Sequence, residues 1–191
     1  MNDLRSIPAY FMRGGTSKGL IFHKKDLPSD RNILTGYLLK IMGSPDVRQI
    51  NGLGGGTSVT SKVCIISKSI EKDVDIDYFF AQVEVDWNHV DYAPTCGNML
   101  SAIGPFAIEE WLVETSNEIT KVNVKSINTN ALITLDVLTP GGKLKYSGDF
   151  KIDGVPGTGS QILMNFKNLE GKTTGNLFPT GNTTEQILLR E

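Results

Sequence analysis

The sequence has few of the residues that build metal sites or disulfide frameworks. Its 191 residues include only two cysteines and two histidines. Two cysteines form no disulfide framework, so we expect no fold held together by disulfides. His23 and His89 have no carboxylate or cysteine at ligand spacing, so we also expect no metal site.

Long apolar runs and clusters of like charge are also missing. No stretch is long and apolar enough to span a membrane, and the polar residues 1–5 lack a signal-peptide core. We therefore expect a cytoplasmic protein with no membrane association. Lysine and arginine are scattered and the formal net charge is −2, which gives little support to nucleic-acid binding. With 39% hydrophobic and 21% charged residues, the composition is that of a globular protein.

The hydrophobic pattern predicts an α+β fold, a curved and mainly antiparallel sheet wrapped around a central helix. Strand-like runs occur at residues 7–12, 20–22, 62–66, 74–78, 83–86, 121–127, 131–138, 143–152 and 161–166. A loop is expected between the first two runs, over residues 13–19. The last part, residues 169–191, is polar and rich in turn residues, so we expect one domain over residues 1–168 followed by a connector.

Two helices are predicted. Ser29 or Asp30 can cap the first, which has one apolar stripe and ends at Gly43. The second, residues 98–113, is apolar on nearly all sides and should be buried on nearly all sides. Pro105 inside it removes one backbone hydrogen bond, so a local bend is expected.

Cys96 stands directly before the second helix. A helix N-terminus offers unpaired N–H groups and a partial positive charge, which suit a carboxylate ligand and can activate a thiol. The N–H groups of Gly97, Asn98 and Met99 could therefore bind a carboxylate, and Cys96 could carry a proton. An inert core cysteine is the alternative, and it is the one we expect for Cys64, which lies in an apolar run.

Lys62 follows a loop rich in glycine and hydroxyl groups. It also opens the apolar run 63–66, in which alternate side chains point inward. An inward lysine can lose its charge and act as a base, whereas an outward one is simply solvated. The pattern alone leaves both interpretations open.

Two glycine loops look superficially like nucleotide-binding motifs. Residues 14–19 lack the Walker spacing, and residues 52–57 lack the third glycine of the dinucleotide fingerprint. Both still offer N–H and hydroxyl donors suited to a carboxylate, and both are equally explained as tight turns.

Several motifs in their order resemble the PrpF family. This family includes 2-methylaconitate cis–trans isomerase, methylitaconate Δ-isomerase and oxalomesaconate tautomerase. The motifs lie at residues 12–19, 52–58, 60–63, 96–98, 104–108, 153–158 and 179–182. The resemblance implies the N-terminal half of a diaminopimelate-epimerase-like fold, in which each half wraps a barrel-like sheet around a helix.

The resemblance also implies a cofactor-independent isomerase acting on an unsaturated di- or tricarboxylate of the methylaconitate or itaconate type, as in propionate metabolism. Lys62 would remove a proton and Cys96 would return it, or the reverse. Gly97 and Asn98 would bind a substrate carboxylate. The hydroxyl residues expected nearby are Ser17, Thr57 and Ser58.

Family members carry a second homologous half, with the active cleft between the halves. This chain ends where that half should begin, so we expect the isolated chain to present half a site. One alternative is a non-catalytic carboxylate-binding or accessory protein for an aconitase-like dehydratase. Another is an amino-acid epimerase of the wider fold. A homodimer is a further partner arrangement that the sequence leaves open.

Overall fold

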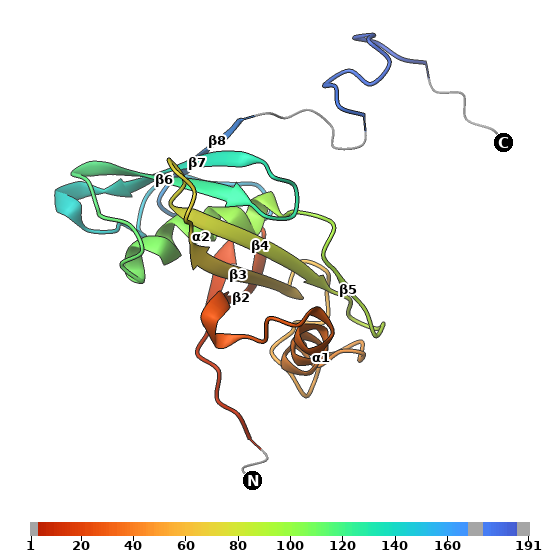
Figure 1. Cartoon of the computed structure of the whole chain (residues 1–191). Helices are drawn as coiled ribbons and strands as arrows, with labels where there is room; N and C mark the ends of the chain where they lie inside the picture. Colours follow the sequence, from red (N-terminus) through yellow and green to blue (C-terminus); the bar gives the residue numbers. More distant parts are fainter. Residues whose placement is uncertain (1–3, 168–173, 187–191) are drawn as a thin grey trace.

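The computed structural model describes residues 4–167 and 174–186 (Figure 1). Within them, eight strands form one mixed sheet in the order β1-β2-β3-β4-β6-β7-β8, with β5 paired to β4. The strands are β1 Tyr10–Gly14, β2 Ser17–His23, β3 Lys62–Lys68, β4 Ile76–Val83, β5 Val90–Asp91, β6 Glu118–Ser126, β7 Leu132–Thr139 and β8 Ile162–Lys167. Only the β2–β3 and β4–β6 pairings are parallel among these strands, so the mainly antiparallel prediction is confirmed.

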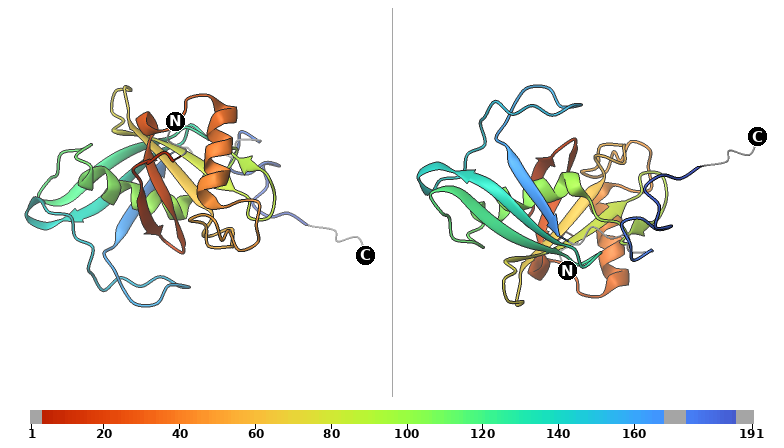
Figure 2. Two further views of the ribbon diagram at one scale, coloured as in Figure 1. Left: turned by 90° about the horizontal axis from the view of Figure 1, so that it is seen from below. Right: turned by 90° about the horizontal axis from the view of Figure 1, so that it is seen from above.

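The sheet curls around helix α2, Gly97–Glu109, while helix α1, Arg31–Met42, packs on its outer side (Figure 2). Each side has its own hydrophobic core. In β3, Cys64 and Ile66 belong to the core with α2, whereas Val63 and Ile65 belong to the core with α1. Burial on both faces explains why this strand is a continuous apolar run.

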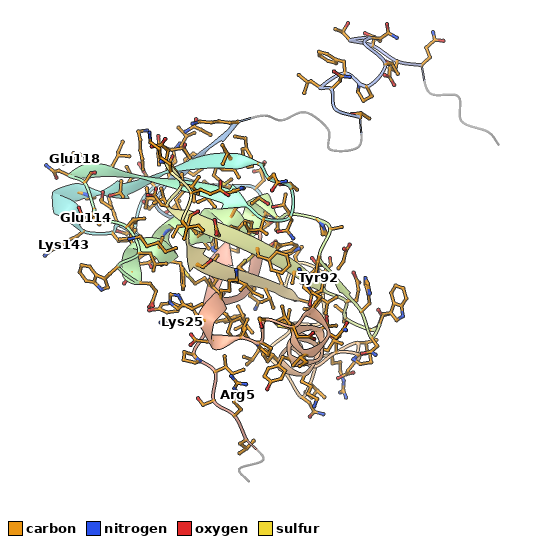
Figure 3. All side chains as sticks on the ribbon, viewed as in Figure 1. Arg5, Lys25, Tyr92, Glu114, Glu118 and Lys143 are labelled. Atoms are coloured by element: carbon orange, nitrogen blue, oxygen red, sulfur yellow. The ribbon has the colours of Figure 1, made fainter. Side chains whose placement is uncertain are left out.

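Helix α1 begins at the second of its two predicted caps. The Asp30 carboxylate accepts hydrogen bonds from the N–H groups of Asn32 and Ile33, each at 3.0 Å. Gly43 ends the helix with φ 84°, a left-handed conformation that glycine adopts freely. Tyr92, labelled in Figure 3, lies against this helix, and its hydroxyl is 2.9 Å from that of Thr35.

Helix α2 is the buried central helix that the pattern predicts. Its fully or nearly fully buried residues are Met99, Leu100, Ala102, Ile103, Gly104, Pro105, Phe106, Ala107 and Ile108. The helix ends at Glu109, before the predicted residue 113. Trp111 adopts φ 55°, a left-handed conformation that a helix cannot continue through.

Three predicted segments differ in the structure. The loop expected over residues 13–19 is a two-residue turn, since Gly14 pairs with Ser17 in a hairpin. The stretch 74–86, predicted as one half-exposed strand or a pair of strands, contains one strand, β4, over Ile76–Val83, and residues 84–86 lie outside it. Residues 143–152 form no strand, only an isolated bridge between Phe150 and Gly159, because most of their side chains are exposed and no neighbouring strand pairs with them.

A short 3₁₀ helix η1, Lys24–Asp26, follows β2, and another, η2, Pro140–Gly142, follows β7. Residues 174–186 are exposed and contain no helix or strand. The predicted domain boundary at residue 168 lies outside the described residues, as do residues 169–173 and 187–191 of the predicted connector. None of the helices in the described part is long and apolar enough to cross a membrane.

Candidate active site

The predicted site residues gather at one end of the curved sheet. In the sheet register, Gly19 at the start of β2 lies beside Lys62 at the start of β3, and Lys62 lies opposite Gln82 at the end of β4. The N-terminus of α2 reaches the same region through Asn98, which contacts the β1–β2 turn. Three strands and a helix end therefore meet there.

Cys96 is the N-cap of α2. Its Sγ accepts a hydrogen bond from the N–H of Met99 at 3.5 Å, so the prediction that Met99 is also free to bind a carboxylate is wrong. Among the described residues, the N–H groups of Gly97 and Asn98 have no acceptor. These two N–H groups, at the positive end of the helix dipole, form a site for an anion.

The β1–β2 turn is fixed against this helix end. The Asn98 amide donates to the hydroxyl of Thr16 at 2.8 Å and to that of Ser17 at 3.4 Å. A Cβ atom at Gly14 would lie 2.3 Å from the Asn98 carbonyl oxygen, so only glycine fits this approach. Ser17 is only 2% exposed and is thus a buried part of the site's wall.

Lys62 is half-buried and its amine is held inside the fold. Nζ donates to Gln82 Oε1 at 2.6 Å and lies 5.2 Å from the centre of the Phe80 ring. The inward interpretation of Lys62 is therefore the one that the geometry supports.

Cys64 lies near both Lys62 and Cys96, since both affect its pKa. It is on the same face of β3 as Lys62, two residues further on, and belongs to the core cluster on which Cys96 packs. Burial, and then the neighbouring Cys96 thiol, raise the pKa of Cys64 far above its ordinary value. Cys64 is thus the inert core cysteine that the sequence predicts.

Tyr78 contacts the start of helix α2 through its hydroxyl group. Its hydroxyl donates to the Cys96 carbonyl oxygen at 3.1 Å. Burial raises the pKa of Tyr78 well above its usual value, so the phenol remains neutral. Tyr78 and Gln82 were not predicted from the sequence. The only sequence feature that marks them is their even spacing, which in a strand places both side chains on the same face.

The glycine loop contacts the site through a backbone carbonyl group, that of Ser58. The Thr57 hydroxyl is 2.7 Å from that of Thr60, and the Ser58 carbonyl oxygen accepts from Gln82 Nε2 at 3.1 Å. Within the described residues the Ser58 hydroxyl has no partner. The structure therefore joins Ser17 to Asn98 by a hydrogen bond, with Gly97 next to Asn98 at the start of α2, but it does not join the Thr57 and Ser58 side chains to them.

Two cavities flank these elements. One of about 290 Å³ adjoins Asn98 and is lined by two cationic side chains, Arg13 and Lys145, and by no acidic residue. A larger one, of about 790 Å³, lies between η1, α1 and the outer face of the sheet, and none of the predicted site residues lines it. In the described part of the chain, no group of three or more His, Cys, Asp or Glu side chains could hold a metal ion.

Comparison with known proteins gives a consistent set of relatives. The 4-oxalomesaconate tautomerase of Pseudomonas putida is 47% identical over 181 residues, which are 95% of this chain and 50% of that protein. The 3-methylitaconate isomerase of Eubacterium barkeri is 46% identical over 187 residues, 98% of this chain and 49% of that protein. The chain thus spans about half the length of the curated relatives it matches.

A solved structure shows the same fold. The crystal structure of methylitaconate-delta-isomerase superposes with a TM-score of 0.88 at 46% identity, over 95% of this chain and 47% of that one. The predicted diaminopimelate-epimerase-like half-barrel is therefore confirmed. A family model described as PrpF protein matches residues 4–189, so this chain belongs to the PrpF family.

Proposed function

We propose that the full-length protein is an isomerase that moves a proton, and with it a double bond, in an unsaturated di- or tricarboxylate. Lys62 and Cys96 are its acid–base pair. The observation that carries the proposal is the placement of Cys96 at a helix start with two free N–H groups, together with an inward-held lysine at the start of β3. Both groups lie near enough to Cys64 to affect its pKa. The names of the relatives, an isomerase and a tautomerase, support the same class of reaction.

The free N–H groups of Gly97 and Asn98 suit one substrate carboxylate. Their position at the positive end of α2 stabilises the negative charge that grows on this carboxylate when the adjacent carbon loses a proton. These donors are fixed before the substrate binds, because Asn98 is hydrogen-bonded to the β1–β2 turn. Preorganised donors of this kind are usually a large term in catalysis.

In the proton-transfer step, neutral Lys62 takes the allylic proton onto Nζ, and the electron pair of the broken C–H bond delocalises into the conjugated carboxylate. The Cys96 thiol then gives its proton to the other end of the allylic system, which moves the double bond by one carbon. The two groups return to their starting forms when the proton passes from Lys62 to the Cys96 thiolate, directly or through water. For another substrate the roles reverse, with Cys96 as the base and Lys62 as the acid.

The second carboxylate fits the smaller cavity. Arg13 and Lys145 line it beside Asn98, without an acidic residue in the lining itself, so two cationic side chains are available to an anion that enters there. This arrangement favours a di- or tricarboxylate over a monocarboxylate. It also favours such an acid over an amino acid, whose ammonium group would be repelled.

The test is product formation, followed by proton NMR, when full-length protein is incubated with 3-methylitaconate, 2-methylaconitate or oxalomesaconate. We expect one acid to isomerise, and expect Lys62→Met and Cys96→Ser each to lower kcat by at least ~100-fold. Thr139→Val is the control, because Thr139 is bonded to Thr120 and Ser116 at the far end of β7. Full activity in both site variants would contradict the proposal, and tight binding without turnover of any acid would favour the accessory-protein alternative.

A further inference from the structure

The Gln82 side chain makes three hydrogen bonds at the proposed catalytic lysine, one to Lys62 itself and two to the backbone before it, and no function assigned so far explains them. It faces Lys62 directly across the antiparallel β3–β4 pair. Its Oε1 accepts from Lys62 Nζ at 2.6 Å, and its Nε2 donates to the carbonyl oxygens of Ser58 at 3.1 Å and Ser61 at 3.0 Å.

These bonds leave the Gln82 amide only one orientation. A carboxamide has two N–H donors, and both are used by the two carbonyl oxygens. If the amide were turned over, its oxygen would face two carbonyl oxygens and its nitrogen would face the Lys62 amine. The acceptor is therefore fixed toward Nζ by the backbone of the glycine loop.

We propose that Gln82 is a positioning residue that holds Lys62 Nζ in place for proton transfer. This inference rests on the proposed role of Lys62. With the Phe80 ring 5.2 Å from Nζ and Gln82 bonded to it, a flexible four-carbon side chain is restrained at its tip. Because a misplacement of about 1 Å can lower a rate by ~100-fold, such restraint is a direct contribution to catalysis.

The neutrality of Gln82 matters as much as its position. A neutral carbonyl oxygen accepts a hydrogen bond from an ammonium group and from a neutral amine alike. Lys62 can therefore gain and lose a proton without losing its anchor. A carboxylate at the same place would hold the lysine in its charged form and oppose its action as a base.

The contacts also couple Lys62 to the glycine loop. The Gln82 amide donates hydrogen bonds to the carbonyl oxygens of Ser58 and Ser61. Both residues belong to the last part of the loop that leads into Lys62. Movement of that loop would move the Gln82 oxygen and with it the lysine. The Gln82 amide is thus hydrogen-bonded both to the glycine loop and to the proposed base, Lys62.

Kinetics of Gln82→Leu and Gln82→Glu in full-length protein test this role. For Gln82→Leu, which removes the acceptor, we expect kcat to fall about 10- to 100-fold while KM changes less than about threefold. For Gln82→Glu, we expect the rising limb of the pH–rate profile to move at least about one pH unit to the alkaline side. Thr139→Val should change stability but neither the kcat-to-KM pattern nor the pH profile.

A second measurement does not depend on activity. In protein labelled with ¹⁵Nζ-lysine, and at a pH on the acidic side of the pH–rate profile where Lys62 is protonated, a hydrogen-bonded, slowly exchanging Lys62 ammonium gives a signal that Lys62→Arg removes. We expect Gln82→Leu to broaden or lose this signal and Thr139→Val to keep it. An unchanged Lys62 signal and pH profile in the Gln82 variants would overturn the proposal. Absence of isomerisation by the unaltered protein would instead contradict the proposed function, while the Lys62 signal would still decide the role of Gln82.

Discussion

At the residue scale, the two cysteines show how position decides chemistry. Cys64 is 0% exposed in the core, and its pKa is raised far above the ordinary value because burial disfavours the thiolate. Cys96 is partly exposed at the start of α2, where the helix end favours negative charge. The same residue type is therefore inert at one position and suited to proton transfer at the other.

This contrast predicts selective alkylation. In native protein at pH 8, iodoacetamide should add once, at Cys96, and Cys64 should react only after denaturation. Peptide mass spectrometry locates the adduct, and Cys96→Ser provides the control, which should take up no label in the native state. Equal labelling of both cysteines would show that Cys64 is not held in the core.

Glu110 is a second group whose ionisation is set by its neighbours. The Tyr10 hydroxyl donates to it, and His23 Nε2 lies 2.6 Å from its other oxygen. The pKa of Glu110 is lowered, first by the bond from Tyr10 and then by that from His23. A carboxyl with a lowered folded pKa adds stability above its unfolded pKa, about 4.3, and this stability is lost as the pH falls through the folded pKa.

The expected result for Glu110→Gln follows from the direction of this pKa shift. At pH 7 the free energy of unfolding should fall by about 1 kcal/mol, since bonds to a partly exposed charge are weakened by solvent. The difference from the unaltered protein should shrink below about pH 4. Urea unfolding at pH 7, 5 and 3 measures it, with the exposed Glu114→Gln as control. A difference that stays constant over this pH range would contradict the assignment.

At the element scale, helices were predicted better than strands. Helical period, caps and glycine stops are local signals, and they gave α1 and α2 to within a few residues. Strand status also depends on a distant partner. Residues 143–152 have an apolar pattern but no strand to pair with, whereas β4 continues through residues 79–82 because β3 lies beside it.

The sequence offered two caps for α1, Ser29 and Asp30, and the structure selects Asp30. Because the Asp30 carboxylate accepts two backbone bonds, Asp30→Ala should lower the free energy of unfolding by about 1 kcal/mol. Ser29→Ala should change it by less than about 0.5 kcal/mol. Thermal or urea unfolding compares the two variants, and a larger loss for Ser29→Ala would reverse the assignment.

The contact between the β1–β2 turn and α2 gives a matched pair of glycine substitutions. Gly14→Ala places a methyl group 2.3 Å from the Asn98 carbonyl oxygen, so it should destabilise the fold by at least about 2 kcal/mol. A Cβ at Gly97 meets nothing within 4 Å, so Gly97→Ala should fold normally. If a substrate carboxylate binds the Gly97 N–H, KM should nevertheless rise in Gly97→Ala. A stable Gly14→Ala protein would show that the turn does not pack as described.

At the scale of the whole molecule, the curved sheet buries most of α2, including Ala102 to Ile108, and leaves Gly97 and Asn98 at its N-terminus accessible. That end, the start of β3 and the end of β4 come together although Lys62 and Gln82 are 20 residues apart and Asn98 and Thr16 are 82 apart. Motif order could therefore identify Lys62 and Cys96 as candidates, but not their partners. Gln82 and Tyr78 can be identified as partners of these residues only when the register of the paired strands is known.

The chain spans about half the length of the curated relatives it matches, so the proton transfer proposed for Lys62 and Cys96 concerns the full-length protein. Its most direct test is deuterium uptake at the allylic carbon of 3-methylitaconate, 2-methylaconitate or oxalomesaconate in heavy water, measured by NMR. We expect uptake with the unaltered protein, and a loss of at least ~100-fold in both Lys62→Met and Cys96→Ser. Isomerisation without any uptake of solvent deuterium, or uptake that survives in both variants, would contradict it.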